Sequence, residues 1–325
     1  MNPLVTAAAA AAVCSAVLWL LLRFAARRLP LDVPNARSLH ERPVPRIGGV
    51  AMLAGVAAAV LAGFAPFGLA LALAGALALL SFIDDLRPLP TLVRLAGHVA
   101  AAAVLAWYVL SPMQWLELAL IALGIAWLTN LYNFMDGSDG LAGGMSVAGF
   151  GAYALAAWLA GDQATALVSV ALVGAAAAFL SFNLPPARVF LGDVGSIPLG
   201  FLAGALGVTG WRNDAWPLWF PLLVFAPFIG DATVTLLRRL LRRERVWQAH
   251  KEHYYQRLVR MGFGHRGTAW AAYAAMLACA VAALVARTQP PAMQAGIFGG
   301  TTLLLALFAV WIDLRWARHL RAGGG

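Results

Sequence analysis

Apolar stretches long enough to cross a bilayer recur along the whole chain. About 20 apolar residues, coiled as an α-helix, cross the roughly 30 Å hydrocarbon layer of a membrane. Glycine and alanine dominate many of these stretches, which is typical of membrane helices that pack closely through small side chains. The sequence therefore predicts an all-α fold, a polytopic membrane helical bundle of about eleven transmembrane helices. The predicted spans lie near 4–22, 47–64, 68–83, 93–110, 116–133, 142–160, 164–182, 196–210, 217–236, 269–286 and 294–314.

Composition leaves little room for a separate soluble domain. Of the 325 residues, 62% are hydrophobic and 11% are charged, whereas soluble domains carry about 25% charged residues. We therefore expect residues 1–325 to form a single integral membrane domain. Cys14 and Cys279 both fall inside predicted spans. A thiol there behaves as a small apolar group, so neither cysteine indicates a disulfide or a metal site.

The basic residues lie almost entirely on one side of the predicted bundle. Alternate threading puts 21 of the 23 Lys and Arg residues on the same side, and leaves only Arg212 and Arg287 on the other. Such a bias in short loops identifies the basic side as the cytoplasm. The prediction is a periplasmic N-terminus and a cytoplasmic C-terminus. Orientation accounts for most of the net charge of +9, so no nucleic acid is expected as a partner.

Six of the fourteen acidic residues are expected at the cytoplasmic ends of predicted spans, all at one membrane depth. Each is predicted near the C-terminal end of a helix, where the helix dipole disfavours a carboxylate by up to about 1 kcal/mol. Local helix stability therefore does not explain them, although a single aspartate could simply be a solvated loop residue. Asp231 has the further alternatives of helix capping or pairing with Arg238 or Arg239. The six are Asp84, Asp85, Asp136, Asp139, Asp193 and Asp231.

A shared cation would offset the repulsion among these carboxylates. Two like charges about 4 Å apart repel by roughly 4 kcal/mol at an effective dielectric constant near 20. Oxygen-only ligands suit Mg²⁺, which takes one or two protein oxygens and completes its shell with water and substrate phosphate. The spacing of Asn133, Asp136 and Asp139 would aim all three toward one side of a helical or near-helical segment.

A basic and histidine-containing segment, AHKEHYYQRL, lies between the ninth and tenth predicted spans. His250, Lys251 and His253 in this segment favour recognition of a phosphate group. Zinc binding by the two histidines has no third ligand nearby, and binding of lipid headgroups is a second alternative. For Arg94, snorkelling to the headgroups competes with a position facing the acidic cluster. His98, inside the fourth predicted span, is expected to have a core or surface role, as is His40.

Five ordered motifs carry a resemblance over roughly residues 35–268. They are NARSLHERPVPRIGG, SFIDDLRPLP, TNLYNFMDGSDGLAGG, FLGDVGS and AHKEHYYQRL. In this order and at these membrane positions they resemble the polyprenyl-phosphate N-acetylhexosamine-1-phosphate transferase family. That family includes the translocase that begins lipid-linked peptidoglycan synthesis and the initiating transferases of O-antigen and teichoic acid assembly. Eleven spans with an outer N-terminus resemble the O-antigen branch.

The resemblance implies a role for each matching residue. Asp84 and Asp85 match the essential acidic pair beside the lipid phosphate, and Asp136 and Asp139 match residues tied to activity and nucleotide binding. Asn133 and Asp193 match the ligands of Mg²⁺, for which Mn²⁺ can substitute. Substrate-binding positions are matched by Arg94, Asn130, Asn133, His250, Lys251 and His253. Because His-Lys-Glu-His replaces a run of adjacent histidines, a UDP-N-acetylhexosamine is expected as donor rather than the muramoyl-pentapeptide nucleotide.

The resemblance also implies a reaction and a location. A polyprenyl (undecaprenyl) phosphate would attack the β-phosphorus of the UDP-sugar at the cytoplasmic face of the bacterial inner membrane, and UMP would leave. Asp84 could accept the proton of the lipid phosphate, or Asp84 or Asp85 could form a covalent aspartyl-phosphate intermediate. An ion-coupled transporter is the rival function, although carriers usually place ionisable residues near mid-membrane. Sugar identity and oligomeric state, monomer or homodimer, stay open.

Overall fold

The computed structural model describes residues 2–24, 30–34, 39–40, 42–66, 68–112, 114–245, 248 and 250–323. Nearly all regular structure is helical, as the sequence predicts, apart from one two-stranded antiparallel ribbon. The elements are α1 (Pro3–Phe24), β1 (Leu31–Asp32), β2 (Val44–Pro45), α2 (Gly48–Leu61), α3 (Leu69–Leu86), α4 (Thr91–Leu110), α5 (Trp115–Phe134), α6 (Leu141–Ala160), α7 (Gln163–Asn183), α8 (Asp193–Arg212), α9 (Trp219–Val224), α10 (Ala226–Leu241), α11 (Tyr254–Leu258), the π-helical segment η2 (Val259–Phe263), α12 (Gly264–Ala286) and α13 (Pro291–Arg321).

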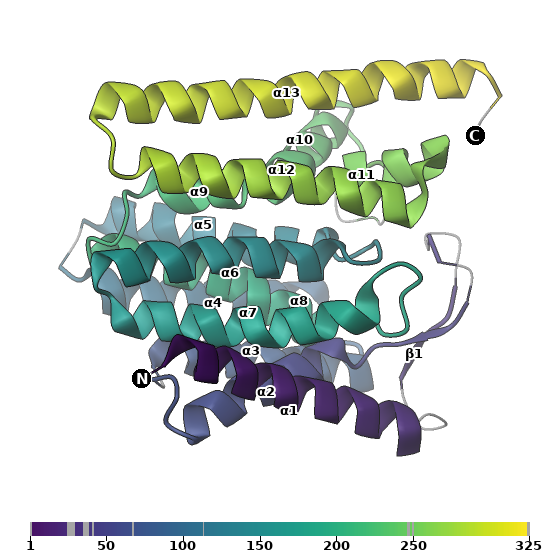
Figure 1. Ribbon diagram of the computed structural model, residues 1–325. Coiled ribbons are helices and arrows are strands. Elements are labelled where there is room, and N and C mark those ends of the chain that lie inside the picture. The colour runs from purple at the N-terminus through teal and green to yellow at the C-terminus, as the bar shows by residue number, and fades with distance from the viewer. Residues whose placement is uncertain are drawn as a thin grey trace.

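The long helices lie side by side, with α1 and α2 at one edge and α13 at the opposite edge (Figure 1). Helix α8 is the most enclosed, since 89% of its most apolar 18-residue stretch is buried, against 6% for α13. Small residues on α8 allow its neighbours to pack closely around it. A Cβ on Gly200 would lie 2.6 Å from the carbonyl oxygen of Leu128 on α5, so only glycine allows the two helices to approach this closely.

Nine helical segments within the described residues are long and apolar enough to cross a membrane. Two of the eleven predicted spans do not form single helices of that length. Helix α2 has 14 residues, and the span predicted over 217–236 is divided at Phe225 into α9 and α10. The total of eleven and the orientation of the termini therefore stay predictions. The two labelled chain ends do lie at opposite ends of the bundle (Figure 1).

The segment before α2 is tied to the segment before α8. The backbone N–H groups of Gly48 and Gly49 donate to the carbonyl oxygens of Phe190 and Leu191 at 2.9 and 2.8 Å. A Cβ on Gly49 would lie 2.3 Å from the backbone nitrogen of Gly195, so this contact requires glycine. These backbone contacts fix the first turn of α8. Residues 35–38 and 41, in the first of the five motifs, lie outside the described residues.

Candidate functional site

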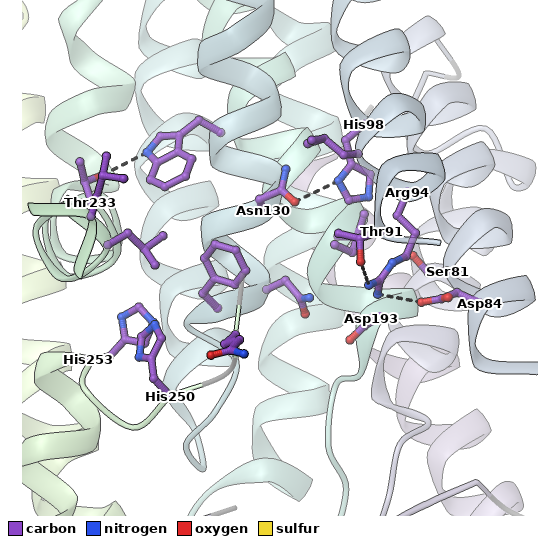
Figure 2. A pocket seen from close by; sticks show the side chains of 18 of the residues that line it. Ser81, Asp84, Thr91, Arg94, His98, Asn130, Asp193, Thr233, His250 and His253 are labelled. Atoms are coloured by element: carbon purple, nitrogen blue, oxygen red, sulfur yellow. Dashed lines mark hydrogen bonds and ion pairs between the residues drawn. The ribbon is translucent and has the colours of Figure 1, made fainter. Parts of the chain in front are cut away.

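A cavity of about 750 Å³ opens between α3, α4, α5, α8 and α10, and the segment before α11 covers one side of it. It gathers polar side chains from parts of the chain up to 170 residues apart, and one wall is apolar. Figure 2 shows Arg94 and Asp84 at one side, His250 and His253 at the other, and Asn130 and Asp193 between them. Seven of the predicted site residues line it: Asp84, Arg94, Asn130, Asn133, Asp193, His250 and His253.

Arg94 faces the acidic cluster rather than the headgroups. Its Nη1 donates to Asp84 Oδ2 at 2.9 Å, and its Nη2 lies 3.4 Å from the hydroxyl of Thr91. The other oxygen of Asp84 accepts the backbone N–H of Leu89 at 2.7 Å, which also closes the turn between α3 and α4. Both oxygens of Asp84 are therefore engaged. The Nε of Arg94 is buried and has no partner within the described part of the chain.

Asp193 begins α8, which corrects the sequence prediction for this residue. It was expected at the C-terminal end of a helix, but it lies in the first turn, where the helix dipole favours a carboxylate. No residue that the structure describes donates a hydrogen bond to this carboxylate. On the facing helix α5, the Oδ1 of Asn133 accepts the hydroxyl of Ser196 at 2.7 Å, which leaves one lone pair of that oxygen free.

The prediction that Asn133, Asp136 and Asp139 point to one side is wrong for Asp139. Helix α5 ends at Phe134, so Asp136 and Asp139 lie in the turns before α6. The carboxylate of Asp139 accepts the backbone N–H of Ala187 at 2.9 Å and lies 3.6 Å from His265 Nδ1, outside the cavity. Asp139 thus connects loops, and the geometry gives it no direct access to the cavity.

Asp136 and Asp85 lie near the cavity but do not line it. Burial, followed by the negative charge of Asp193, raises the pKa of Asp136 well above its ordinary value, while Arg46 opposes the shift. Asp85 is exposed at the end of α3 and lies within electrostatic range of Asp193 and Arg46. Lys251 is half-buried beside the histidines and does not line the cavity. The cluster therefore includes acidic groups beyond the cavity lining, and the surroundings of Asp136 favour its uncharged form.

Asp231 orients His253, and it does not pair with Arg238 or Arg239. Its Oδ1 accepts from His253 Nδ1 at 3.1 Å, and its two oxygens accept the backbone N–H groups of Tyr254 and Tyr255 at 2.9 and 3.0 Å. The capping alternative is thus observed, although the capped helix is α11 and not the helix that carries Asp231. Because Nδ1 of His253 is taken, Nε2 is left for the cavity. Arg238 pairs with Asp313, and Arg239 pairs with Glu244 and Glu252.

His250 is held in its uncharged form by its surroundings. Burial, then the neighbouring His253 and Arg239, lowers the pKa of His250 to about 4, so the free ring is neutral near pH 7. The two rings lie 4.8 Å apart. Glu252, between them in sequence, pairs with Arg239 and Arg242, which fastens the segment to α10. The segment thus presents one neutral imidazole and one that a carboxylate supports.

Several cavity residues were not predicted from the sequence. His98, expected in the core or on the surface, is buried but lines the cavity and bonds Asn130 through Nδ1 at 3.2 Å. Its spacing of four from Arg94 on one helix is a signal that could have indicated this shared face. The Trp127 indole donates to Thr233 at 3.1 Å across the apolar wall, and no sequence pattern connects these two residues.

The oxygen ligands at the cavity fit a hard divalent cation. Asp193 and Asn133 offer carboxylate and amide oxygens at the cavity, and the Asp193 carboxylate lacks a hydrogen-bond donor within the described residues. Across that same part of the chain, no three His, Cys, Asp or Glu side chains are grouped to hold a metal. This arrangement does not suit zinc, which takes three or four protein ligands. It suits Mg²⁺, which takes one or two protein oxygens and completes its shell with water and phosphate.

Comparisons with known proteins point to one family. A sequence model described as glycosyl transferase family 4 matches residues 67–211, which contain every predicted cavity residue except those near His250. The chain is 34% identical over 285 residues to the decaprenyl-phosphate N-acetylglucosaminephosphotransferase of Mycolicibacterium smegmatis, covering 72% of this chain and 69% of the relative. It is 27% identical over 301 residues to the probable undecaprenyl-phosphate N-acetylglucosaminyl 1-phosphate transferase of Bacillus subtilis, with 87% and 81% covered. A shorter match, 45% identical over 96 residues, is to the phospho-N-acetylmuramoyl-pentapeptide-transferase of Shouchella clausii, covering 30% of each chain.

Proposed function

The chain belongs to glycosyl transferase family 4, and on this premise we propose that it transfers an N-acetylhexosamine 1-phosphate from a UDP-sugar to a polyprenyl phosphate. UMP leaves, and a lipid-diphosphate sugar that initiates a cell-envelope glycan forms. N-acetylglucosamine is the favoured sugar, because it appears in the names of the relatives that match over most of their length. Family membership favours this transferase over the ion-coupled transporter.

The observation that carries the proposal is a cavity with a charged side and an apolar wall. Phosphate-binding and acidic side chains from α3, α4, α8 and the 250–253 segment meet the apolar residues of α10 there. The apolar wall is formed by Leu236, Leu237 and Leu240. A soluble nucleotide requires the first surface and a prenyl chain requires the second, so the two substrates can meet only where both are present.

Each charged group has a task in this reaction. Arg94, held by Asp84 and Thr91, places its guanidinium toward the phosphates, and His250 and His253 approach them from the opposite side. Asn133 and Asp193 would hold Mg²⁺, which would supply positive charge against the diphosphate and the leaving UMP. The excess of basic residues on one side of the bundle supports a site at the cytoplasmic face of the inner membrane, where UDP-sugars are soluble.

The hydrogen bonds of Asp84 favour direct attack by the lipid phosphate over a route through a covalent aspartyl-phosphate intermediate. Both oxygens of this carboxylate accept hydrogen bonds, from Leu89 and Arg94, and a carboxylate paired in this way is a weak nucleophile. We therefore propose that the lipid phosphate oxygen attacks the β-phosphorus directly. Exchange of labelled UMP into the UDP-sugar without lipid would require a covalent intermediate and would overturn this route.

A panel assay tests the proposed function. The purified protein in detergent is given Mg²⁺, polyprenyl phosphate and one UDP-sugar at a time, and UMP and the lipid product are measured. UDP-N-acetylglucosamine is expected to give both products in equal amounts, and omission of the lipid should abolish both. Absence of UMP release from every UDP-N-acetylhexosamine would contradict the proposal, and release without a lipid product would indicate hydrolysis instead.

A further inference from the structure

His98 lies deeper in the bundle than the charged residues of the cavity. It follows Arg94 by one turn of α4, so both side chains share one face of the helix, and His98 is about 6 Å farther from the site end. The side chain is 6% exposed, yet its ring lines the cavity beside Asn130 (Figure 2). His98 therefore stands where the charged end of the cavity meets the bilayer-facing part.

The hydrogen bonds of Asn130 fix which nitrogen of His98 carries hydrogen. Asn130 Nδ2 donates to the carbonyl oxygen of Ala126 at 2.7 Å, so its Oδ1 is the atom 3.2 Å from His98 Nδ1. An amide oxygen only accepts, which assigns the hydrogen to Nδ1. In the neutral ring, Nε2 is then an acceptor left for the cavity, and no residue in the described part of the chain donates to it.

Among the phosphate groups of the two substrates, only that of the lipid carries a hydrogen near neutral pH. The diphosphate oxygens of a UDP-sugar carry no hydrogen near pH 7. A phosphate monoester, with a second pKa near 6, keeps one P–O–H hydrogen for part of the time. The polyprenyl phosphate is such a monoester and enters from the bilayer side, where His98 lies. Nε2 of His98 is open to the cavity rather than sealed in the core, so a P–O–H group that enters the cavity can donate to it.

Asp84 is a poorer acceptor for this proton than His98. Its Oδ1 is taken by the backbone N–H of Leu89 and its Oδ2 by Arg94, at 2.7 and 2.9 Å. Hydrogen bonds to the charged form of a carboxylate stabilise that form and make it a weaker base. The open Nε2 of His98 has no such competitor within the described residues.

The charges around His98 come from three helices. Arg94 lies on its own helix, Asp84 on α3 and Asp193 on α8, while α5 contributes the neutral Asn130. Arg94 and Asp84 form a pair that is neutral as a unit. In the proposed reaction the carboxylate of Asp193 would be neutralised by Mg²⁺, so it does not hold the ring in its charged form, and the imidazolium gives up its proton readily.

We propose that Nε2 of His98 takes the proton from the P–O–H group of the acceptor lipid phosphate, which makes His98 a catalytic base in the proposed transfer. The O–H bond breaks and an N–H bond forms on the ring. The freed oxygen bonds to the β-phosphorus of the UDP-sugar, the bond from that phosphorus to the UMP oxygen breaks, and the imidazolium then releases its proton to water. This inference rests on the proposed function.

The test compares pH profiles of variants with saturating UDP-sugar and variable polyprenyl phosphate. Both His98→Ala and His98→Gln are expected to lose about 100-fold in rate at pH 6, the lower range for loss of a general base. The loss should shrink at least tenfold by pH 8.5, because the acceptor is then already a dianion. His319→Gln on α13 makes the same change of side chain far from the cavity, and it should follow the wild type at every pH.

A second variant separates proton transfer by His98 from a change in the shape of the cavity. In Asn130→Asp, a carboxylate would hold Nδ1–H and favour the imidazolium, so Nε2 would carry a proton before the acceptor arrives. The pH range over which its rate rises should therefore shift to higher pH. Equal losses at all pH values in the His98 variants, or an unshifted Asn130→Asp profile, would overturn the inference while wild-type transfer still upholds the proposed function. A wild type without transfer would overturn both.

Discussion

The two ends of the helical bundle are held together by different kinds of contact. At the end opposite the cavity, the rings of Tyr153 and Trp216 stack at 4.9 Å and those of Trp216 and Phe220 at 5.1 Å. Their polar atoms are paired, since the Tyr153 hydroxyl donates to Ala203 and the Trp216 indole donates to Gly207. At the cavity end, Asp193 lacks a hydrogen-bond donor within the described residues, and Asp136 has a raised pKa.

The difference teaches where this fold carries its chemistry. Paired polar atoms and stacked rings give stability, and among the residues that the structure describes none at the Trp216 end carries a buried charge without a partner. The cavity end keeps carboxylates close together, an arrangement that costs free energy until a cation or a substrate arrives. Substitutions at the cavity end should therefore change activity more than stability, and substitutions at the opposite end should do the reverse.

The largest expected effect is at Asp193. Asp193→Asn should lower transfer by about 10³-fold, or about 4 kcal/mol, because one of the two proposed Mg²⁺ ligands loses its charge. The melting temperature should stay equal or rise, since a charge that burial disfavours is removed. Transfer and melting are measured on the same preparation.

Asp162→Asn is the matched control for Asp193→Asn. Asp162 caps α7 at the opposite end of the bundle by accepting the backbone N–H of Thr165 at 3.0 Å. Asparagine caps a helix nearly as well as aspartate, so neither activity nor stability should change much. Near wild-type transfer by Asp193→Asn at saturating Mg²⁺ would remove this residue from the reaction and with it the contrast between the two ends.

Trp216→Ala tests the opposite end. The side chain is 3% exposed and stacked on two rings, so truncation should lower the free energy of unfolding by about 3 kcal/mol. The folded fraction should keep wild-type turnover. Trp158→Ala removes an indole that is 55% exposed at the surface of α6 and should cost far less. Loss of turnover in properly folded Trp216→Ala would show that the two ends are coupled.

A smaller effect is expected from the residue that orients His253. Asp231→Asn should reduce kcat/KM by about tenfold, or about 1.4 kcal/mol, because His253 loses its carboxylate partner and turns more freely. Asp313→Asn is the control, since Asp313 binds Arg238 and Arg257 near Tyr254 but lies outside the cavity. Equal losses in both variants would mean that stability of this region, rather than the orientation of His253, sets the rate.

The sequence predicted the helical class and the main members of the cavity because both depend on simple physical limits. Charges are costly inside a bilayer, so aspartates in an apolar chain mark functional positions. Asp84, Asn133 and Asp193, which the motifs singled out, all line one cavity. Their catalytic and metal-binding roles stay predictions.

What the sequence did not predict depends on where helices begin and end. Spacing placed Asp136 and Asp139 on the side of Asn133, but α5 ends at Phe134 and the following turns direct Asp139 to Ala187 and His265. Asp193 was assigned to the end of one helix, although Gly192 with a φ of +72° starts a new helix at that residue. The cavity role of His98 and the capping of α11 by Asp231 require the tertiary arrangement of helices distant in sequence.

The smallest expected effect is a pH dependence that belongs to the cavity end alone. The folded protein holds the pKa of His250 at about 4, below the ordinary imidazole value of 6.5, so the unfolded chain binds more protons between these pH values. Unfolding is therefore favoured as the pH falls from 6.5 toward 4, and His250 adds to the loss of stability. In His250→Gln, the melting temperature should fall less steeply over this range than in the wild type. His319→Gln controls for the removal of one imidazole. Identical slopes in His250→Gln and the wild type would mean that this ring is not held neutral in the folded protein.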